Sequence, residues 1–128
     1  MITLDYSDSR PIYEQIVEKY KLLILKGVLA PDEQMPSVRN LAMEISTNPN
    51  TVQKAFAELE RQGFIYAVKG RGNFVAANPA LLTERKKQIA RQIAEKMQEA
   101  TSIGIPRAEM LKAVEEAEQE MEKEVSHD

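Results

Sequence analysis

Side chains able to hydrogen-bond to a nucleic acid gather in three short runs within residues 37–71. The first two runs stand near the starts of predicted helices, and they consist of Ser37 and Arg39 and of Asn50, Thr51, Gln53 and Lys54. The third run forms a glycine turn and consists of Lys69, Gly70 and Arg71. A guanidinium such as that of Arg39 can pair bidentately with guanine or with phosphate, and short polar side chains at a helix start can reach base edges. The cations of the turn suit the phosphate backbone or the minor groove. These residue types predict recognition of double-stranded DNA.

Each of these residues also has an ordinary structural interpretation. Arg39 can be a solvated surface arginine, and the polar residues after Pro49 can simply be good first-turn residues of a helix. Asn48 is interpreted as a helix cap rather than as a base reader, and Lys54 as a contact to phosphate. The turn that holds Lys69 and Arg71 can be a plain hairpin turn.

Catalytic arrangements are missing from the sequence. It has no Ser-His-Asp, Cys-His or HExxH arrangement and no phosphate-cradling GxxxxGK, and the glycines of 70–72 stand in a hairpin turn instead of between a strand and a helix. Cysteine is absent, and His127, the single histidine, falls in the predicted tail. We therefore predict no enzyme activity, no cofactor and no metal site.

Two short helices are predicted to carry the first two runs. Ser37 can cap a helix whose apolar face holds Val38, Leu41, Ala42 and Ile45. Asn48-Pro49 is a second helix start, and a helix from about 49 to 62 would bury Val52, Ala55, Phe56 and Leu59 before Gly63 ends it. Only Ser46 and Thr47 separate the two helices, which is typical of a helix-turn-helix.

A two-stranded wing is predicted to carry the third run. Residues 64–68 are β-prone, residues 69–72 form a turn, and residues 73–76 return as a second strand. The predicted fold is mostly α with a small β-wing: a winged helix-turn-helix over 1–77, followed by a helical hairpin over 78–128.

Three motifs in this order resemble the GntR superfamily of bacterial transcription regulators: PSVRNLA at 36–42, NPNTVQKAFAELERQGFI at 48–65 and KGRGNFV at 69–75. The NPNTV start and the short remainder are similar to the YtrA-type branch. The resemblance is close over roughly residues 10–77. It implies that Arg39 reaches DNA, that the C-terminal helices form a dimer, and that the regulated genes encode an ABC transporter. It assigns no effector ligand.

Several residues depart from the family pattern. Ser46 stands where related sequences commonly have Gly, so a turn with positive φ there should cost about 1 kcal/mol. Asp32 stands where Gly often follows proline and is expected to affect only a loop, and Asn40 removes half of a capping box. Other branches have Arg at the positions of Pro49 and Gln53, so their operator rules should not be transferred.

The segments before the helix pair are predicted to support it. Alternating Ile2, Leu4 and Tyr6 indicate either a short edge strand or an ordered arm. A helix should run from Pro11 to Gly27, and residues 34–35 can add a very short strand beside the wing.

Residues 78–128 are predicted to form two amphipathic helices. Asn78-Pro79 starts the first helix, residues 103–106 break it, and a second helix follows. Their apolar faces cannot be buried well within one hairpin, so we predict a homodimer through Leu82, Ile89, Ile93, Met97, Leu111, Val114 and Met121.

The charge distribution agrees with a DNA-binding N-terminal part. The net charge is −3, but residues 1–77 hold nine basic and nine acidic side chains while residues 101–128 hold three and eight. No signal peptide or membrane span is recognisable, so a cytoplasmic protein is expected. One alternative is a winged-helix module for protein contact or replication control, which would bind little DNA.

Overall fold

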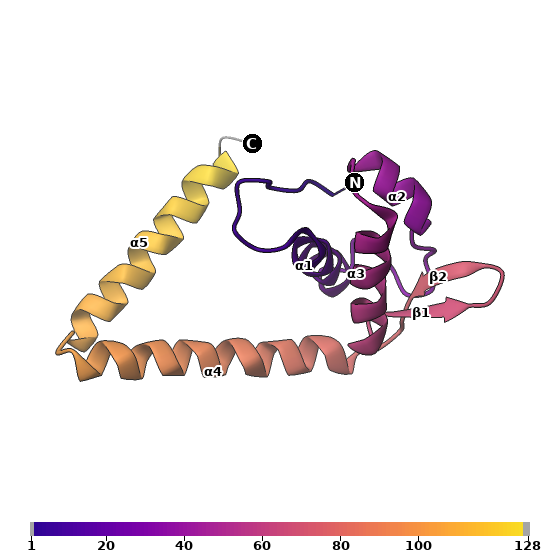
Figure 1. Ribbon diagram of the computed structural model, residues 1–128. Helices are drawn as coiled ribbons and strands as arrows, with labels where there is room; N and C mark the ends of the chain where they lie inside the picture. The colour runs from indigo at the N-terminus through magenta and orange to yellow at the C-terminus, as the bar shows by residue number, and fades with distance from the viewer. Residues whose placement is uncertain (1, 127–128) are drawn as a thin grey trace. The chain divides into compact units, whose positions relative to one another are not determined.

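The computed structural model describes residues 2–126, which form five helices and one small antiparallel sheet (Figure 1). In chain order these are α1 Ile12–Leu25, α2 Val38–Glu44, α3 Pro49–Arg61, β1 Ile65–Val68, β2 Gly72–Val75, α4 Ala80–Ser102 and α5 Arg107–Ser126. The mostly helical fold with a β-wing is thus confirmed. The chain divides into two compact units, the first ending at Thr83 and the second beginning at Glu84. His127, predicted to lie in the tail, is outside the described residues.

Helix α3 is the centre of the first unit, because it contacts α1, α2 and β1. Figure 1 shows α1 and the wing on either side of it. The predicted apolar faces of the helix pair are buried here except at Val38, which is half-buried at the edge of the core. With support from the rest of the first unit they form a single core: Ile16, Val17, Tyr20, Leu29, Met35, Leu41, Ala42, Ile45, Val52, Ala55, Phe56, Leu59, Phe64, Ile65 and Val75. Within it the rings of Tyr20 and Phe56 meet edge to face, with centroids 6.0 Å apart.

The helix ends follow the capping residues closely. Ser37 caps α2 by accepting a hydrogen bond from the Asn40 amide at 3.0 Å, and Asn48 caps α3 by accepting one from the Asn50 amide at 2.8 Å. Gly63 follows α3 with φ +84°, as predicted. The helix-turn-helix turn does require a positive φ, since Ser46 has φ 51°.

The wing pairs Ile65 with Val75 and Val68 with Gly72, so each strand starts one residue away from its predicted position. Gly70, with φ +78°, forms the turn that the Arg71 amide closes by donating to the Val68 carbonyl at 2.9 Å. The predicted short strand at 34–35 is present as a single bridge between Gln34 and Phe74.

Asp32 ties the loop before α2 to the wing. It has φ 65°, its amide donates to the Val75 carbonyl at 2.8 Å, and its carboxylate accepts a hydrogen bond from the Tyr66 hydroxyl at 2.7 Å. That hydrogen bond, more than burial, raises the pKa of Tyr66. The expectation that Asp32 affects only a loop is therefore wrong, because the residue also holds a wing strand.

The N-terminal segment is an ordered arm rather than an edge strand. Residues 2–10 have no strand pairing, while Ile2 and Leu4 pack against the core of the first unit. Alternating apolar residues fit both alternatives, because packing two side chains on a core needs the same spacing as a half-buried strand.

The second unit carries most of the amphipathic hairpin. Helix α4 begins at Ala80, whose amide is capped by Asn78 at 3.2 Å, and Leu81 packs partly against the winged core. The predicted break falls at 103–106, where Gly104 has φ +84°. Seven predicted dimerisation residues have exposed side chains: Leu82, Ile89, Ile93, Met97, Leu111, Val114 and Met121. Among residues 2–126 no helix is both long and apolar enough to cross a membrane.

Removing the Tyr20 hydroxyl should not weaken the fold. This hydroxyl is fully buried, has no hydrogen-bond partner within residues 2–126, and has its pKa raised to about 12 by burial and then by the charge of Glu44. Because an unsatisfied buried polar group costs about 1–3 kcal/mol, Tyr20→Phe should leave the free energy of unfolding unchanged or raise it by up to that amount. Urea unfolding measures this.

Tyr66→Phe is the matched control, since it deletes a hydroxyl that does hydrogen-bond. We expect it to lower the free energy of unfolding, because it removes a hydrogen bond that the native state forms. Equal losses for Tyr20→Phe and Tyr66→Phe would show that the Tyr20 hydroxyl has a partner in solution.

Candidate nucleic-acid interface

The start of α2 presents Arg39 to solvent. Ser37 is extended and uses its hydroxyl oxygen to cap the helix, which fixes the direction of the first turn. Arg39 lies in that turn with an exposed side chain and has no hydrogen-bond or ion-pair partner within residues 2–126. An unpaired guanidinium on a short, well-capped helix is free to bind a base edge or a phosphate.

The start of α3 presents short polar side chains. Asn50 and Gln53 are exposed and Thr51 is half-buried, while Val52 between them points into the core. Pro49 at the first helical position and the Asn48 cap fix where the helix begins. The partial positive charge of a helix N-terminus adds to the attraction for a phosphate.

Lys54 has a contact that sequence analysis missed. Its ammonium lies over the ring of Tyr13 in α1, with Nζ 3.8 Å from the ring centroid, in a cation–π arrangement. The expected phosphate contact of Lys54 stays a prediction, and the residue also joins α3 to α1. No local spacing could reveal this pair, because the two residues are far apart in the sequence.

An acidic groove limits the interface on the α1 side of α3. The groove has a volume of about 410 Å³, and its charged lining includes Arg10, Glu14, Glu18, Lys54 and Glu58. Hydrogen bonds from Arg61, and then from Gln62, lower the pKa of Glu58 to about 2, so its carboxylate stays ionised at neutral pH. Three carboxylates outnumber the cations Arg10 and Lys54 in this lining, so apart from Lys54 the groove attracts phosphate less than the three runs do.

The wing tip presents Lys69, Gly70 and Arg71, all of which are exposed. Beneath the tip the rings of Tyr66 and Phe74 stack with centroids 5.7 Å apart. The Gln34 side-chain amide donates to the Arg71 carbonyl at 2.9 Å. These contacts hold the backbone of the turn in place, and the side chains of Lys69 and Arg71 remain exposed on it.

The first unit therefore contains all three runs. They lie at the start of α2, at the start of α3 and in the turn that follows β1, and both α2 and β1 contact α3. Six of the seven predicted dimerisation residues lie in the second unit, and Leu82 lies in the first. The arrangement can bind a nucleic acid through side-chain hydrogen bonds and charge. Sequence analysis also missed the hydrogen bonds that Tyr6 and Gln15 form with residues distant in the sequence.

Comparisons with known proteins agree with this geometry. Residues 12–75 match the family described as bacterial regulatory proteins, gntR family. The HTH-type transcriptional repressor YtrA of Bacillus subtilis (strain 168) is 51% identical over 78 residues, which cover 61% of this chain and 60% of that repressor's length. This similarity supports the predicted YtrA-type branch.

Solved structures give the same result. A GntR family transcriptional regulator from Listeria monocytogenes is similar with a TM-score of 0.73 and 33% identity, over 88% of this chain and 98% of that one. AraR(DBD) in complex with operator ORE1 is similar with a TM-score of 0.51 and 32% identity, over 58% of this chain and 90% of that one. These relatives are regulators rather than enzymes. The chain belongs to the gntR family of bacterial regulatory proteins, which are DNA-binding transcription regulators with a winged helix-turn-helix.

Proposed function

We propose that this protein is a cytoplasmic, homodimeric repressor that binds an inverted-repeat operator. The observation that carries the proposal is that three polar and cationic runs, exposed except at the half-buried Thr51, lie on one compact winged unit, with Arg39 unpaired within residues 2–126. In the proposal the DNA contacts come from Ser37, Arg39, Asn50, Thr51, Gln53, Lys54, Lys69, Gly70 and Arg71. Arg39 and the polar residues of α3 read bases, while Lys54 and the wing turn hold the phosphate backbone or minor groove.

The homodimer part of the proposal is supported by the exposed apolar faces of α4 and α5. Within the second unit the two helices line an open groove of about 880 Å³ that includes Ile89, Ile93, Met97 and Val114. An exposed apolar surface that is contiguous over two helices is costly in water. A second copy of the same surface would cover it with a two-fold axis, and a symmetric dimer requires symmetric half-sites.

The repressor and target-gene parts rest on similarity. The Bacillus subtilis relative is named a repressor, and the proposal extends that role to this chain. Control of an ABC-transporter operon follows from the resemblance to the YtrA-type branch alone, and no residue of the sequence specifies it.

Footprinting on the region upstream of its own gene should reveal two protected half-sites related by an inverted repeat. Their centres should be separated by about 10–10.5 base pairs or a multiple of it, because each recognition helix enters one major groove. Affinity should fall steeply with salt, since each neutralised phosphate adds roughly −0.9 to the slope of log K against log[salt].

Two results would contradict the proposal. Protection of one asymmetric half-site would rule out binding as a symmetric dimer. Weak binding to all DNA with little salt dependence would favour the alternative module for protein contact.

A further inference from the structure

The turn of the helix-turn-helix differs from the comparable helix ends in one respect. In α1, α3 and α4 the chain leaves the helix through Gly27, Gly63 and Gly104, each with φ between +77° and +84°. Helix α2 leaves through Ser46 with φ 51°. All four ends have the same hydrogen bonds: the positive-φ amide donates to a carbonyl three residues back, and the next amide donates to one five residues back.

At the α2 end these two hydrogen bonds are unequal. The Ser46 amide donates to the Met43 carbonyl at 3.3 Å and the Thr47 amide to the Ala42 carbonyl at 2.9 Å. A residue with a Cβ is disfavoured in this conformation, so its surroundings must hold it there. Ser46 itself is exposed, so its side chain is not held by burial.

Tyr6 supplies an additional contact at this end. Its hydroxyl donates to the Ile45 carbonyl at 2.7 Å, and Ile45 is the residue directly before Ser46. Carbonyls in the last turn of a helix have no partner within that helix. The side chain of Tyr6 is 65% exposed, so burial does not account for its placement over the turn.

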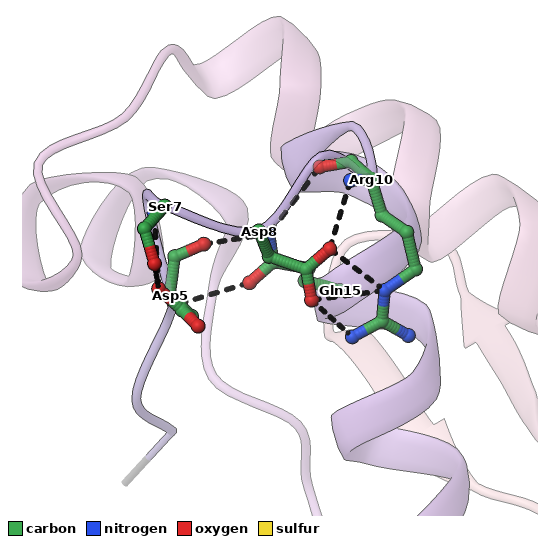
Figure 2. A network of polar contacts seen from close by, with 5 residues as sticks. All are labelled: Asp5, Ser7, Asp8, Arg10 and Gln15. Carbon is green, nitrogen blue, oxygen red and sulfur yellow. Dashed lines mark hydrogen bonds and ion pairs between the residues drawn. The ribbon is translucent and has the colours of Figure 1, made fainter.

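Residues before and after Tyr6 in the arm form polar contacts, and Figure 2 shows those of Asp5, Ser7, Asp8, Arg10 and Gln15. Gln15 of α1 is 2% exposed, and its amide group makes two hydrogen bonds of 2.9 Å to the backbone N–H and C=O of Asp5. After Tyr6, the Ser7 amide donates to the Asp5 carboxylate at 2.9 Å, and Arg10 forms an ion pair with Asp8 at 2.8 Å. Tyr6 therefore reaches the turn from a backbone anchored to the core helix α1.

We propose that Tyr6 is a positioning residue for the recognition helix α3. Only Ser46 and Thr47 lie between the C-cap of α2 at Ile45 and the N-cap of α3 at Asn48, so the backbone angles of Ser46 set the direction in which α3 starts. By holding the Ile45 carbonyl, Tyr6 keeps Ser46 in its positive-φ conformation. Base contacts tolerate a displaced helix less well than phosphate contacts do, so the effect falls on operator discrimination.

Tyr6→Phe tests this by deleting the hydroxyl alone, and Tyr20→Phe is its control because the Tyr20 hydroxyl has no partner within residues 2–126. Amide hydrogen exchange of the free protein reports on the turn without DNA. Loss of one hydrogen bond should speed exchange at Ser46 and Thr47 about fivefold in Tyr6→Phe, whereas Tyr20→Phe should not speed it. Unchanged exchange in Tyr6→Phe would overturn the proposal.

The functional part rests on the proposed operator binding and is measured separately. Tyr6→Phe should weaken operator binding roughly fivefold while binding to random DNA stays the same. Adding Ser46→Gly should restore both exchange and operator affinity, because Gly adopts positive φ without strain. A purely stabilising role would lower Tm and leave the operator-to-random ratio unchanged, which would overturn the positioning role. If the unaltered protein does not prefer an operator, the proposed function fails, and the exchange rates still decide whether Tyr6 holds the turn.

Discussion

Substituting Ile93 with Asp should convert the proposed dimer to monomers and lower operator affinity by two or more orders of magnitude. The Ile93 side chain is 58% exposed within one subunit, and it lies on the α4 face with Ile89 and Met97. In a dimer through this face the new carboxylate would be buried without a partner. Separate half-site binding then loses the gain in effective concentration, which is about 10²–10⁴ for linked modules.

Light scattering coupled to size-exclusion chromatography measures the mass of the variant, and anisotropy titrations measure its operator affinity. Gln88→Asp is the matched control, since it adds the same charge to α4 outside the apolar face. It should remain dimeric. Because Ile93 is exposed in the subunit, Ile93→Asp should retain the Tm of the winged unit.

A chain ending at Thr83 should behave like Ile93→Asp. The core of the first unit is complete by Val75, and Leu81 packs against it, so an end at Thr83 keeps this contact whereas an end at Ala77 would not. Dimers that persist at micromolar concentration in both variants would contradict a dimer through α4 and α5, and would indicate an interface at the N-terminal arm or α1.

Replacing Arg39 with Ala should cost about 1–3 kcal/mol of operator binding and relax the preference at one base position. Arg39 is exposed and has no partner within residues 2–126, so the substitution breaks no contact of the free protein there. The loss would therefore come from the DNA complex. Dissociation constants for the operator, for operators with single base changes and for random DNA measure both effects.

Arg71→Ala is the comparison for this experiment, because it removes a cation from the wing turn. It should weaken binding to all sequences alike and reduce the salt slope by about 1. Lys54→Ala should do the same and should also lower stability, since it removes the cation–π contact with Tyr13. Equal losses on operator and random DNA for Arg39→Ala would make Arg39 a phosphate contact.

The helix-turn-helix was predictable because its signals act locally. Ser37, Asn48 and Gly63 end or start helices through hydrogen bonds and φ angles that involve neighbours within a few residues, and the structure has each in its predicted role. The positive φ of Ser46 was predictable in the same way, as a substitution at a position that favours glycine. Such signals can be recognised from the sequence because they depend only on residues that are close together in it.

The contacts that hold these elements together were not predictable from spacing. Three sets of hydrogen bonds join segments that only the fold brings together. They link Tyr6 to Ile45, Gln15 to Asp5, and Tyr66 to Asp32. The alternating arm sequence likewise fitted both a strand and an ordered arm, because the pattern does not show whether a pairing partner is available. Assignment of individual DNA contacts depends on the operator as well as on the protein.

The exposed acidic surface of α5 has a consequence for the kinetics of association. Arg107–Ser126 holds seven glutamates against three basic residues, and the described side chains are almost all exposed. Phosphate repulsion opposes a first encounter through this helix, while the cations of the winged unit attract the duplex. We therefore expect α5 to disfavour encounters that bring it against the duplex first, and this effect should weaken as added salt shortens the range of the field.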